Sequence, residues 1–419
     1  MRIENLRAEN SADRARVAAT IVWEDCDRAP QEIYYETTRE FGRHLTCDPH
    51  AFLTASVFPA IYHGERRIAI DAPICPELHN GLNVVIAWFH GWFGIPDTIQ
   101  IETRGDTRYP EATPPRTGSF NSGGLDSLAL LRANRLDFPR DHPNSIKDCL
   151  FVHGFDIGGY RDGEMEQASY DLALSALAAV ARDAEVTLIP VYTNIRHLED
   201  NLHFWVYQFH GPALASVAHA FSRRLTNVYV AAGYKIPVLE SAATHPLIEP
   251  NLSSTGLRIR HEGIQYSRLD KVGLIGDWEA ALKNLRVCTR NPPGQLNCGK
   301  CEKCLRTMLE LLIWDRLDQA TAFPAQDVTP DMVEKINFTD TYPALFYQEL
   351  VAPLSAKGRT DLANVIQRKC LAFEKHLAWE EEKDWKGAVK RFDRRWLGGT
   401  LYKTYHAARM AYAHRAASK

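Results

Sequence analysis

Long apolar runs are missing from this chain of 419 residues. No stretch approaches the roughly 18 consecutive apolar residues that a membrane-spanning helix needs. The first residues, MRIENLRAENSADRARV, also lack the basic start and apolar run of a secretory signal peptide. We therefore expect a cytoplasmic protein with no membrane partner.

The chain also lacks a charge bias of either sign. Its formal net charge is -3, with 24% charged and 45% hydrophobic residues, which is ordinary for a soluble globular protein. Only the segment 386–419 is clearly basic, with Asp393 as its one acid. Its aromatic residues favour packing on the protein over binding to RNA or lipid. A nucleic-acid partner is therefore left open but not favoured.

A framework of paired disulfides is disfavoured, because the nine cysteines are odd in number and a reducing compartment keeps thiols free. Four of them follow the pattern C-x9-C-x2-C-x2-C: Cys288, Cys298, Cys301 and Cys304. This spacing suits tetrahedral Zn²⁺ held by thiolates, although an iron–sulfur cluster uses the same ligands. A closed four-sulfur site has no open coordination position, so we expect the metal to be structural.

Neither an internal repeat nor a low-complexity tract divides the chain. Residues 1–112 are predicted to form an N-terminal β-rich (α+β) domain, with strand-like runs at 18–23, 31–37 and 67–70. The apolar stretch 82–93 fits a helix packed on that sheet, and its aromatic and β-branched residues also permit a strand. Three prolines between 110 and 115 mark a linker.

Strands and helices alternate in the middle region, residues 113–315. The strand-like segments are 118–121, 149–153, 186–192 and 228–232. The helical segments are 127–135, 165–182 and 212–221. This alternation predicts an α/β fold with a mostly parallel, doubly wound sheet. Residues 316–419 are expected to form a helical C-terminal region.

A glycine loop, SGGLDS at residues 122–127, lies between the first strand and the first helix of this region. Glycines let the backbone fold tightly against an anion, and the first turn of a helix favours negative charge. Asp126 beside an anion indicates a helix cap or bound Mg²⁺, which favours a magnesium nucleotide. The Gly-Lys-Ser/Thr ending of kinase and GTPase phosphate loops is absent, so transfer of the γ-phosphoryl group is disfavoured.

The hexapeptide resembles the PP-loop of the N-type ATP pyrophosphatases, a family with a HUP-like fold. Its members bind ATP and transfer AMP to a substrate oxygen with release of pyrophosphate. The resemblance implies a phosphate site at Ser122, Gly123, Gly124, Asp126 and Ser127. It also implies that the next strand presents its backbone edge to adenine at Phe151, Val152, His153, Gly154 and Asp156. For His153, a hydrogen-bonded histidine near a strand end is an equal alternative.

The cysteine pattern is similar to the zinc site of the 7-cyano-7-deazaguanine synthase branch of that family. The resemblance covers roughly residues 116–315, about half of the chain. It implies ATP, Mg²⁺ and structural Zn²⁺ as cofactors. It also implies a small-molecule substrate whose carboxylate or amide oxygen is activated for amide- or nitrile-type bond formation. The N-terminal 112 residues and the C-terminal hundred depart from that compact synthase, which puts its literal substrate in doubt.

Polar side chains near other strand ends complete the candidate site. Arg268 and Lys271 are candidate catalytic cations that would stabilise charge developing at the α-phosphate, and Arg258 and Arg260 precede them. Ligands of open α/β sheets bind beyond the strand ends, which makes the following residues candidates for the acceptor end: Asn194, Arg196, His245, Glu249, Ser253, Ser254 and Thr255. The plainer alternatives are a charged surface for the cations, a solvated loop for residues 245–255 and a loop cap for Asn194 and Arg196.

The motifs favour an AMP-forming, ATP-dependent ligase, and they leave three other functions open. An ATP-dependent epimerase of UDP-MurNAc-L-Ala-L-Glu is one, because adenylation chemistry would fit a chain of this length. A tRNA-modifying enzyme that adenylates or thiolates bases is another. A defence-system protein with a synthase-like domain is the third. A homodimer is compatible with all of them.

Overall fold

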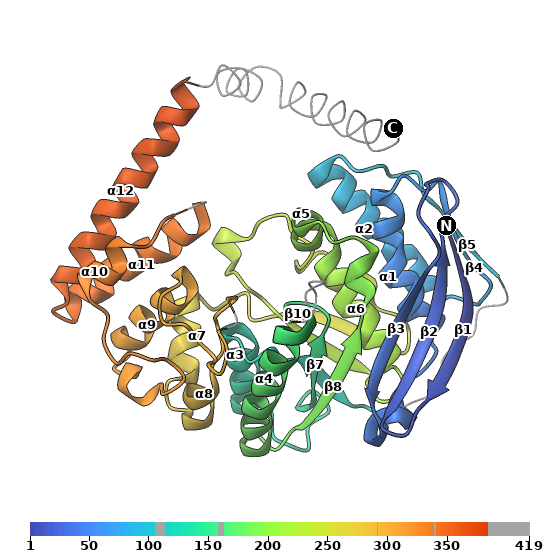
Figure 1. Cartoon of the computed structure of the whole chain (residues 1–419), viewed down its shortest axis with the longest axis horizontal. Helices are drawn as coiled ribbons and strands as arrows, with labels where there is room; N and C mark the ends of the chain where they lie inside the picture. Colours follow the sequence, from blue (N-terminus) through green and yellow to red (C-terminus); the bar gives the residue numbers. More distant parts are fainter. Residues whose placement is uncertain (105–113, 158–162, 291, 339–340, 384–419) are drawn as a thin grey trace. The chain divides into compact units, whose positions relative to one another are not determined.

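The structure is a computed structural model that describes residues 1–104, 114–157, 163–290, 292–338 and 341–383 (Figure 1). The chain divides into two compact units, Met1–Ser267 and Arg268–Lys419. The first unit contains the sheet, and the described part of the second is helical. The basic segment 386–419 lies outside the described residues.

Ten strands of the first unit form one sheet. Their bounds are β1 Arg2–Asn10, β2 Arg14–Val22, β3 Gln31–Thr38, β4 Arg67–Ile70, β5 Gln100–Thr103, β6 Thr117–Phe120, β7 Ile146–His153, β8 Thr187–Thr193, β9 Asn227–Ala231 and β10 Arg258–Glu262. The order across the sheet is β10-β9-β6-β7-β8-β3-β2-β1-β4-β5. Among these strands, six of the nine neighbouring pairs are parallel. The expected α/β fold with a mostly parallel sheet is thus confirmed.

Helices of the first unit follow the strands as the alternating pattern predicts. Their bounds are α1 Pro49–Tyr62, α2 Pro76–Phe93, α3 Leu125–Asp137, α4 Gly163–Asp183, α5 Leu202–Phe204 and α6 His210–Ala220. A π-helical turn, η3 Trp205–Phe209, leads into α6, and the short 3-10 turns include η2 Ile195–Leu198 and η5 Glu249–Leu252. The predicted helices at 127–135, 165–182 and 212–221 correspond to α3, α4 and α6.

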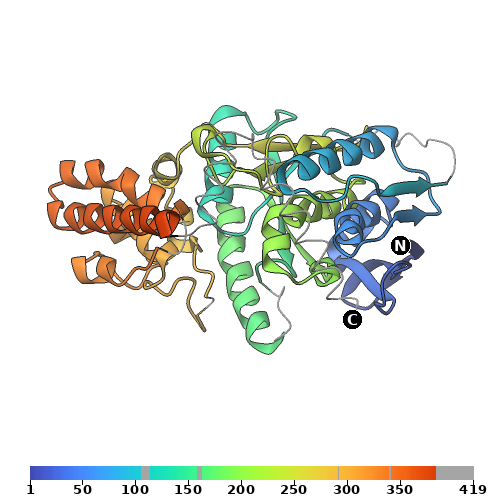
Figure 2. The ribbon, with the colours of Figure 1, turned by 90° about the horizontal axis from the view of Figure 1, so that it is seen from above.

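Helices cover both faces of the parallel strands. Successive strand residues point to opposite faces, and on β7 Leu150 packs in the core shared with α1, α2 and α6, whereas Phe151 packs against Tyr170 and Leu177 of α4. Figure 2 shows α4 (green) and α2 (blue) on different sides of the strands. This two-sided cover is compatible with the doubly wound arrangement that the alternation predicted.

The N-terminal region contains helices as well as strands. The ambiguous stretch 82–93 is helical and ends α2, whose buried residues Leu78, Leu82, Val85 and Phe89 recur at helical spacing. Helix α1 was not predicted, because nearly all of its residues are buried and apolar and such a sequence shows no periodicity. Asp48 caps it by accepting a hydrogen bond from the His50 amide at 3.0 Å.

An antiparallel seam joins the N-terminal strands to the strands around the glycine loop. β3 pairs with β8, with Tyr35 opposite Thr193 and Thr37 opposite Val191. The Thr37 hydroxyl donates to the carbonyl of Pro190 at 2.7 Å. The sheet therefore runs across the boundary expected near residue 112. The domain boundaries expected near 112 and 315 stay predictions.

The second unit is helical in its described residues. Its helices are α7 Arg268–Ile275, α8 Glu279–Asn284, α9 Glu302–Ile313, α10 Pro330–Glu334, α11 Thr341–Ala356 and α12 Thr360–Lys383. Helix α9 is strongly amphipathic and buries Leu305, Met308 and Leu309, while α11 and α12 pack on each other. In the described part of the chain no helix is long and apolar enough to cross a membrane.

Candidate functional site

The glycine loop connects the end of β6 to the start of α3. Gly123 has a φ of 74°, a left-handed conformation that favours glycine. Gly124 is the residue before α3 and brings no side chain that could cap the helix. The first turn of α3 is therefore open to an external anion at the end where the helix dipole favours negative charge. The predicted strand, loop and helix are all in place.

A buried asparagine, Asn121, holds the loop in this shape. Its Oδ1 accepts hydrogen bonds from the Gly123 amide and from the Ser127 hydroxyl, each at 3.0 Å. Its side chain is 2% exposed. Ser127 is also within hydrogen-bond distance of the Gly124 carbonyl, at 3.0 Å. Asn121 was not predicted to be part of the site. The signal that could have indicated it is a polar residue directly after a buried strand.

Ser122 and Asp126 occupy the more open positions of the loop. The Ser122 hydroxyl accepts a 3.3 Å hydrogen bond from the Gly124 amide, and its side chain is exposed. Asp126 lies in the first turn of α3 and is half-buried. Because α3 begins one residue earlier, Asp126 is an acid at a helix N-terminus, where it either stabilises the dipole or faces a cation beside bound phosphate.

The end of β7 holds the residues expected against adenine. Phe151 is buried and stacks on Tyr170, with ring centres 4.7 Å apart, so its side chain belongs to the core. His153 lies edge-on to Tyr170 at 4.8 Å, and burial lowers its pKa. Val152 packs against the opposite core. Gly154 has a φ of 109°, and an added Cβ would lie 1.9 Å from the Thr193 carbonyl oxygen.

Five of the residues expected at the acceptor end lie between β9 and β10. His245 and Glu249 lie together, because Glu249 Oε2 accepts the His245 amide at 2.8 Å. Ser253 instead accepts the Ile259 amide at 2.9 Å, and Thr255 contacts the thiol of Cys75 at 3.2 Å. The remaining serine, at position 254, forms an isolated bridge with residue 257. Of these five residues, only His245 and Glu249 stay candidates for substrate contact.

Asn194 and Arg196 have partners within the first unit. Asn194 accepts the Tyr34 amide at 3.0 Å and donates to the Glu32 carbonyl at 2.8 Å, which connects the end of β8 to β3. Arg196 donates to the Phe155 carbonyl at 2.6 Å. Asn194 therefore has the loop-capping role that was its plainer alternative.

The four candidate cations fall in both units. Arg258 pairs with Glu77 on the surface, and Arg260 lies 2.7 Å from Glu262, so both have the surface-charge role. Arg268 and Lys271 belong to α7 of the second unit. Arg268 donates to Thr307 at 2.7 Å and pairs with Glu310 at 3.1 Å, and Lys271 is 2% exposed. Their catalytic role stays a prediction.

The four cysteines meet in the second unit. Their sulfurs all lie within 4.8 Å of one another, with Cys288 3.9 Å from Cys301 and Cys298 3.9 Å from Cys304. All four are free thiols. Hydrogen bonding with Cys304 lowers the pKa of Cys301 to about 5. The expected ligand set is therefore assembled, and it could bind a structural metal such as zinc.

The turn around the cysteines directs backbone amides at one of the sulfurs. The amides of Lys300 and Cys301 point at the sulfur of Cys298, at 3.5 and 3.3 Å, an arrangement that stabilises a thiolate. Gly299 between them has a φ of 67°, and an added Cβ would lie 2.5 Å from Pro324. Both its conformation and its packing therefore require glycine at this position of the turn.

A second buried asparagine, Asn297, positions the isolated cysteine. Its Oδ1 accepts the amides of Val287 and Cys288 at 2.9 and 3.2 Å. Its Nδ2 donates to the carbonyls of Leu285 and Ala322 at 2.7 and 3.0 Å. The side chain is 1% exposed. Sequence reasoning missed this residue, because its partners lie as far as 25 positions away.

Another group of potential ligands, in the first unit, does not suit a metal. Asp48, His50 and His219 each place one ligand atom within 4.8 Å of the others. However, His50 Nε2 accepts the Cys75 amide at 2.8 Å, and Nδ1 lies 2.7 Å from Asp48. A neutral ring that accepts at one nitrogen and donates at the other has no lone pair left for a metal. Asp48 and His50 form a half-buried hydrogen-bonded pair, and the buried His219 ring packs against His50 with ring centres 5.5 Å apart.

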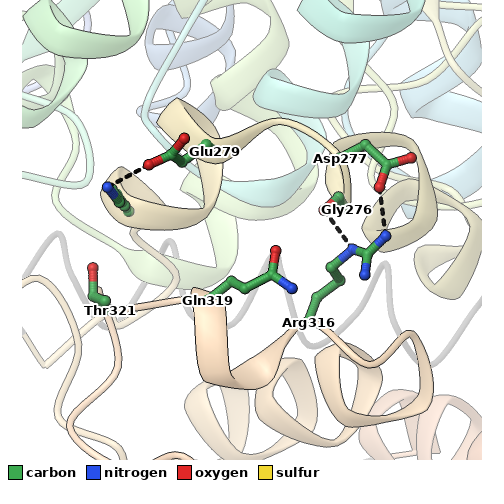
Figure 3. A pocket seen from close by; sticks show the side chains of 7 residues that line it. Gly276, Asp277, Glu279, Arg316, Gln319 and Thr321 are labelled. Carbon is green, nitrogen blue, oxygen red and sulfur yellow. Dashed lines mark hydrogen bonds and ion pairs between the residues drawn. The ribbon is translucent and has the colours of Figure 1, made fainter.

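A surface hollow of about 420 Å³ lies in the second unit (Figure 3). Arg316 donates to the Gly276 carbonyl at 2.8 Å and contacts Asp277 at 2.5 Å, and Lys283 pairs with Glu279 at 2.5 Å. Because its charged groups already neutralise one another, the hollow has no net charge to attract an ionic ligand.

The chain matches no family model, and no curated protein or solved structure was found to be similar to it. The proposed function of the candidate site therefore rests on the residues of the site and their geometry.

Proposed function

We propose that the protein is an ATP-dependent adenylating enzyme of the PP-loop type with a HUP-like first unit. It would activate a carboxylate or amide oxygen of a small molecule by transfer of AMP, with release of pyrophosphate. The observation that carries the proposal is the loop of residues 122–127. It joins a parallel strand to an uncapped helix of 13 residues and contains no lysine that would favour γ-phosphoryl transfer.

The loop supplies the groups that such a reaction needs. The first turn of α3 would receive the phosphates, because its amides lack partners within the helix and the helix dipole favours anions. Asp126 in that turn would hold Mg²⁺, a cation that binds through carboxylates and phosphates. The magnesium would neutralise charge on the departing pyrophosphate, while Asn121 keeps the loop fixed.

The second unit would contribute a structural Zn²⁺ at the four cysteines. Four thiolates complete a tetrahedral zinc site, so the metal would have no open position for substrate. Its role would be to hold the turn 298–304 at the start of α9, as expected for a metal that contributes folding free energy.

The reaction type is tested by the fate of the α-phosphate. Purified protein is incubated with Mg²⁺, α-labelled ATP, hydroxylamine as the nucleophile and a panel of small carboxylic acids and carboxamides. We expect labelled AMP and an equal amount of pyrophosphate, with an Asp126→Asn variant at least about 100-fold slower because its metal ligand is lost. Labelled ADP with inorganic phosphate would instead identify a γ-phosphoryl chemistry and refute the proposal.

A further inference from the structure

A glutamate and three histidines gather where β9 and β10 end. Glu249 is fully buried, and its Oε1 lies 3.3 Å from Nδ1 of His261. His245 donates its amide to the other oxygen of Glu249. His210, at the start of α6, is close enough for Glu249 to influence its pKa, which burial lowers. Glu249 and His261 are here called the Glu249–His261 pair.

Sheet register places this pair at the same edge as the glycine loop. His261 is opposite Val230 on β9, and the preceding β9 residue, Tyr229, is opposite Ser119 on β6. His261 is therefore level with Phe120, just before the loop begins. Neighbouring strands lie about 4.8 Å apart, so the backbones of β10 and β6 are roughly 10 Å apart. Both carboxyl ends point the same way because all three strands are parallel.

The Glu249–His261 pair has unused hydrogen-bonding capacity. Within the part of the chain that the structure describes, neither ring nitrogen of His261 has a hydrogen-bond partner, and the same holds for Oε1 of Glu249. The His261 side chain is only 3% exposed. A buried polar group without a partner is costly. Such a group at the ligand-binding edge of an α/β sheet indicates that a ligand completes its bonds.

We propose that the Glu249–His261 pair is the proton acceptor for the nucleophile that attacks the adenylated substrate. The inference rests on the proposed adenylation. Glu249 would hold a proton on Nδ1, which leaves the lone pair of Nε2 to receive the proton of an N–H or O–H nucleophile. The 3.3 Å distance is long for a hydrogen bond, as is common for catalytic pairs before the substrate binds.

The nucleophile's nitrogen or oxygen forms a bond to the activated carbon, and the bond from that carbon to the AMP oxygen breaks. AMP leaves with the electron pair of that bond. The proton of the nucleophile passes to Nε2 of His261, and the resulting imidazolium is stabilised by the carboxylate of Glu249. No oxidant or reductant is needed.

A first experiment examines the Glu249–His261 pair without any turnover. Nitrogen NMR of the ¹⁵N-histidine-labelled full chain reports which ring nitrogen carries the proton, and a His261→Asn variant assigns the signal. We expect His261 protonated at Nδ1 and bare at Nε2 at neutral pH, with a shift when Mg²⁺ and α,β-methylene-ATP are added. A proton on Nε2, or no shift with bound analogue, overturns the inference. If the analogue does not bind at all, the proposed function fails, and the tautomer still decides the inference.

A second experiment separates the base from the adenylation step. With the same acid panel, product formation is compared between ethylamine, mostly protonated near neutral pH, and hydroxylamine, mostly unprotonated there. His261→Asn is expected to lower the rate with ethylamine by about 100-fold or more and the rate with hydroxylamine by about threefold at most. Equal losses, or none, contradict the proton-acceptor role.

Controls keep these outcomes distinct. His142→Asn alters a histidine before β7, at the opposite edge of the sheet, and should leave both rates unchanged. Glu249→Gln keeps the size of the side chain and should reduce the ethylamine rate about tenfold, because the imidazolium loses its counter-charge. Asp126→Asn should lower AMP formation with both nucleophiles, which marks a failure of adenylation and not of the Glu249–His261 pair.

Discussion

The glycine loop of the first unit and the cysteine turn of the second are built on the same plan and present different chemistry. Each has a left-handed glycine shortly before a helix, Gly123 before α3 and Gly299 before α9. Each is held by a buried asparagine that accepts backbone amides, Asn121 in one and Asn297 in the other. The first exposes the N-terminal end of a helix, where an anion is favoured, whereas the second gathers four sulfurs that could bind a metal cation. The same backbone arrangement is thus compatible with ligands of opposite charge.

Stability is expected to depend on the ligand in the second unit far more than in the first. The glycine loop is joined to a strand with sheet partners on both sides, so its position is secured without ATP. The cysteine turn would depend on Asn297, local packing and the proposed metal. Apparent zinc-binding free energies in small domains are on the order of 10 kcal/mol. The following predictions test this difference.

The largest effect is expected from Cys304→Ser, which removes one ligand of a closed site. Bound zinc, measured by elemental mass spectrometry after dialysis, should fall from about one per chain to near zero. Thermal unfolding of the second unit should shift strongly downward, because metal binding and folding are coupled. Cys47→Ser, a half-buried cysteine of the first unit, is the control. Full zinc retention in Cys304→Ser would show that the cluster is not a four-thiolate site.

Asn297→Leu should weaken zinc binding without abolishing it. The change preserves the volume of the side chain and leaves the amides of Val287 and Cys288 without their acceptor. We expect affinity to fall about 10- to 100-fold, as is typical when a residue that orients a ligand is lost. Competition with a chromophoric chelator measures it, and the Co²⁺ spectrum should stay tetrahedral. Asn284→Ala, which loses one bond to Ala280, should keep the wild-type affinity.

Gly299→Ala separates backbone strain from steric conflict when paired with Gly64→Ala. Both glycines have positive φ, but an added Cβ would meet Pro324 at Gly299 and open space at Gly64. The left-handed conformation alone costs about 1 kcal/mol for a residue with a Cβ. Gly64→Ala should therefore lower the free energy of unfolding, measured in urea, by about that much. Gly299→Ala should lose about 2 kcal/mol or more, since overpacking adds to the strain. Equal losses of unfolding free energy in the two variants would mean that Pro324 moves away from the added Cβ at little cost.

Asn121→Ala should have the smallest effect. It removes the acceptor of the Gly123 amide and of the Ser127 hydroxyl, so the loop becomes less preorganised. We expect the affinity for Mg²⁺ and α,β-methylene-ATP to fall about tenfold, which corresponds to one or two net hydrogen bonds. Calorimetric titration measures it, with Asn10→Ala at the exposed end of β1 as the control. Unchanged affinity would show that the loop holds its shape without Asn121.

Local patterns in the sequence predicted the two loops but not what surrounds them. The SGGLDS loop and the cysteine motif each lie within one short stretch of sequence. The strands and helices around them have a clear periodicity of apolar residues. Asn121 and Asn297 act through partners that local pattern does not reveal. His261 lies 12 residues beyond Glu249 on a strand that was not predicted, so only the folded chain brings the two together. Helix α1 is apolar on all sides and gave no periodic signal.

The pairing of β3 with β8 limits where the chain can be truncated without exposing a sheet edge. Residues paired in this seam lie more than 150 positions apart, so the ladder is completed only after β8 has been synthesised. A fragment that begins after residue 112 would leave Val191, Tyr192 and Thr193 of β8 without their β3 partners and so open this edge of the sheet. Such edges invite pairing between molecules. The first hundred residues therefore protect the part of the sheet that carries the glycine loop from aggregation through this edge.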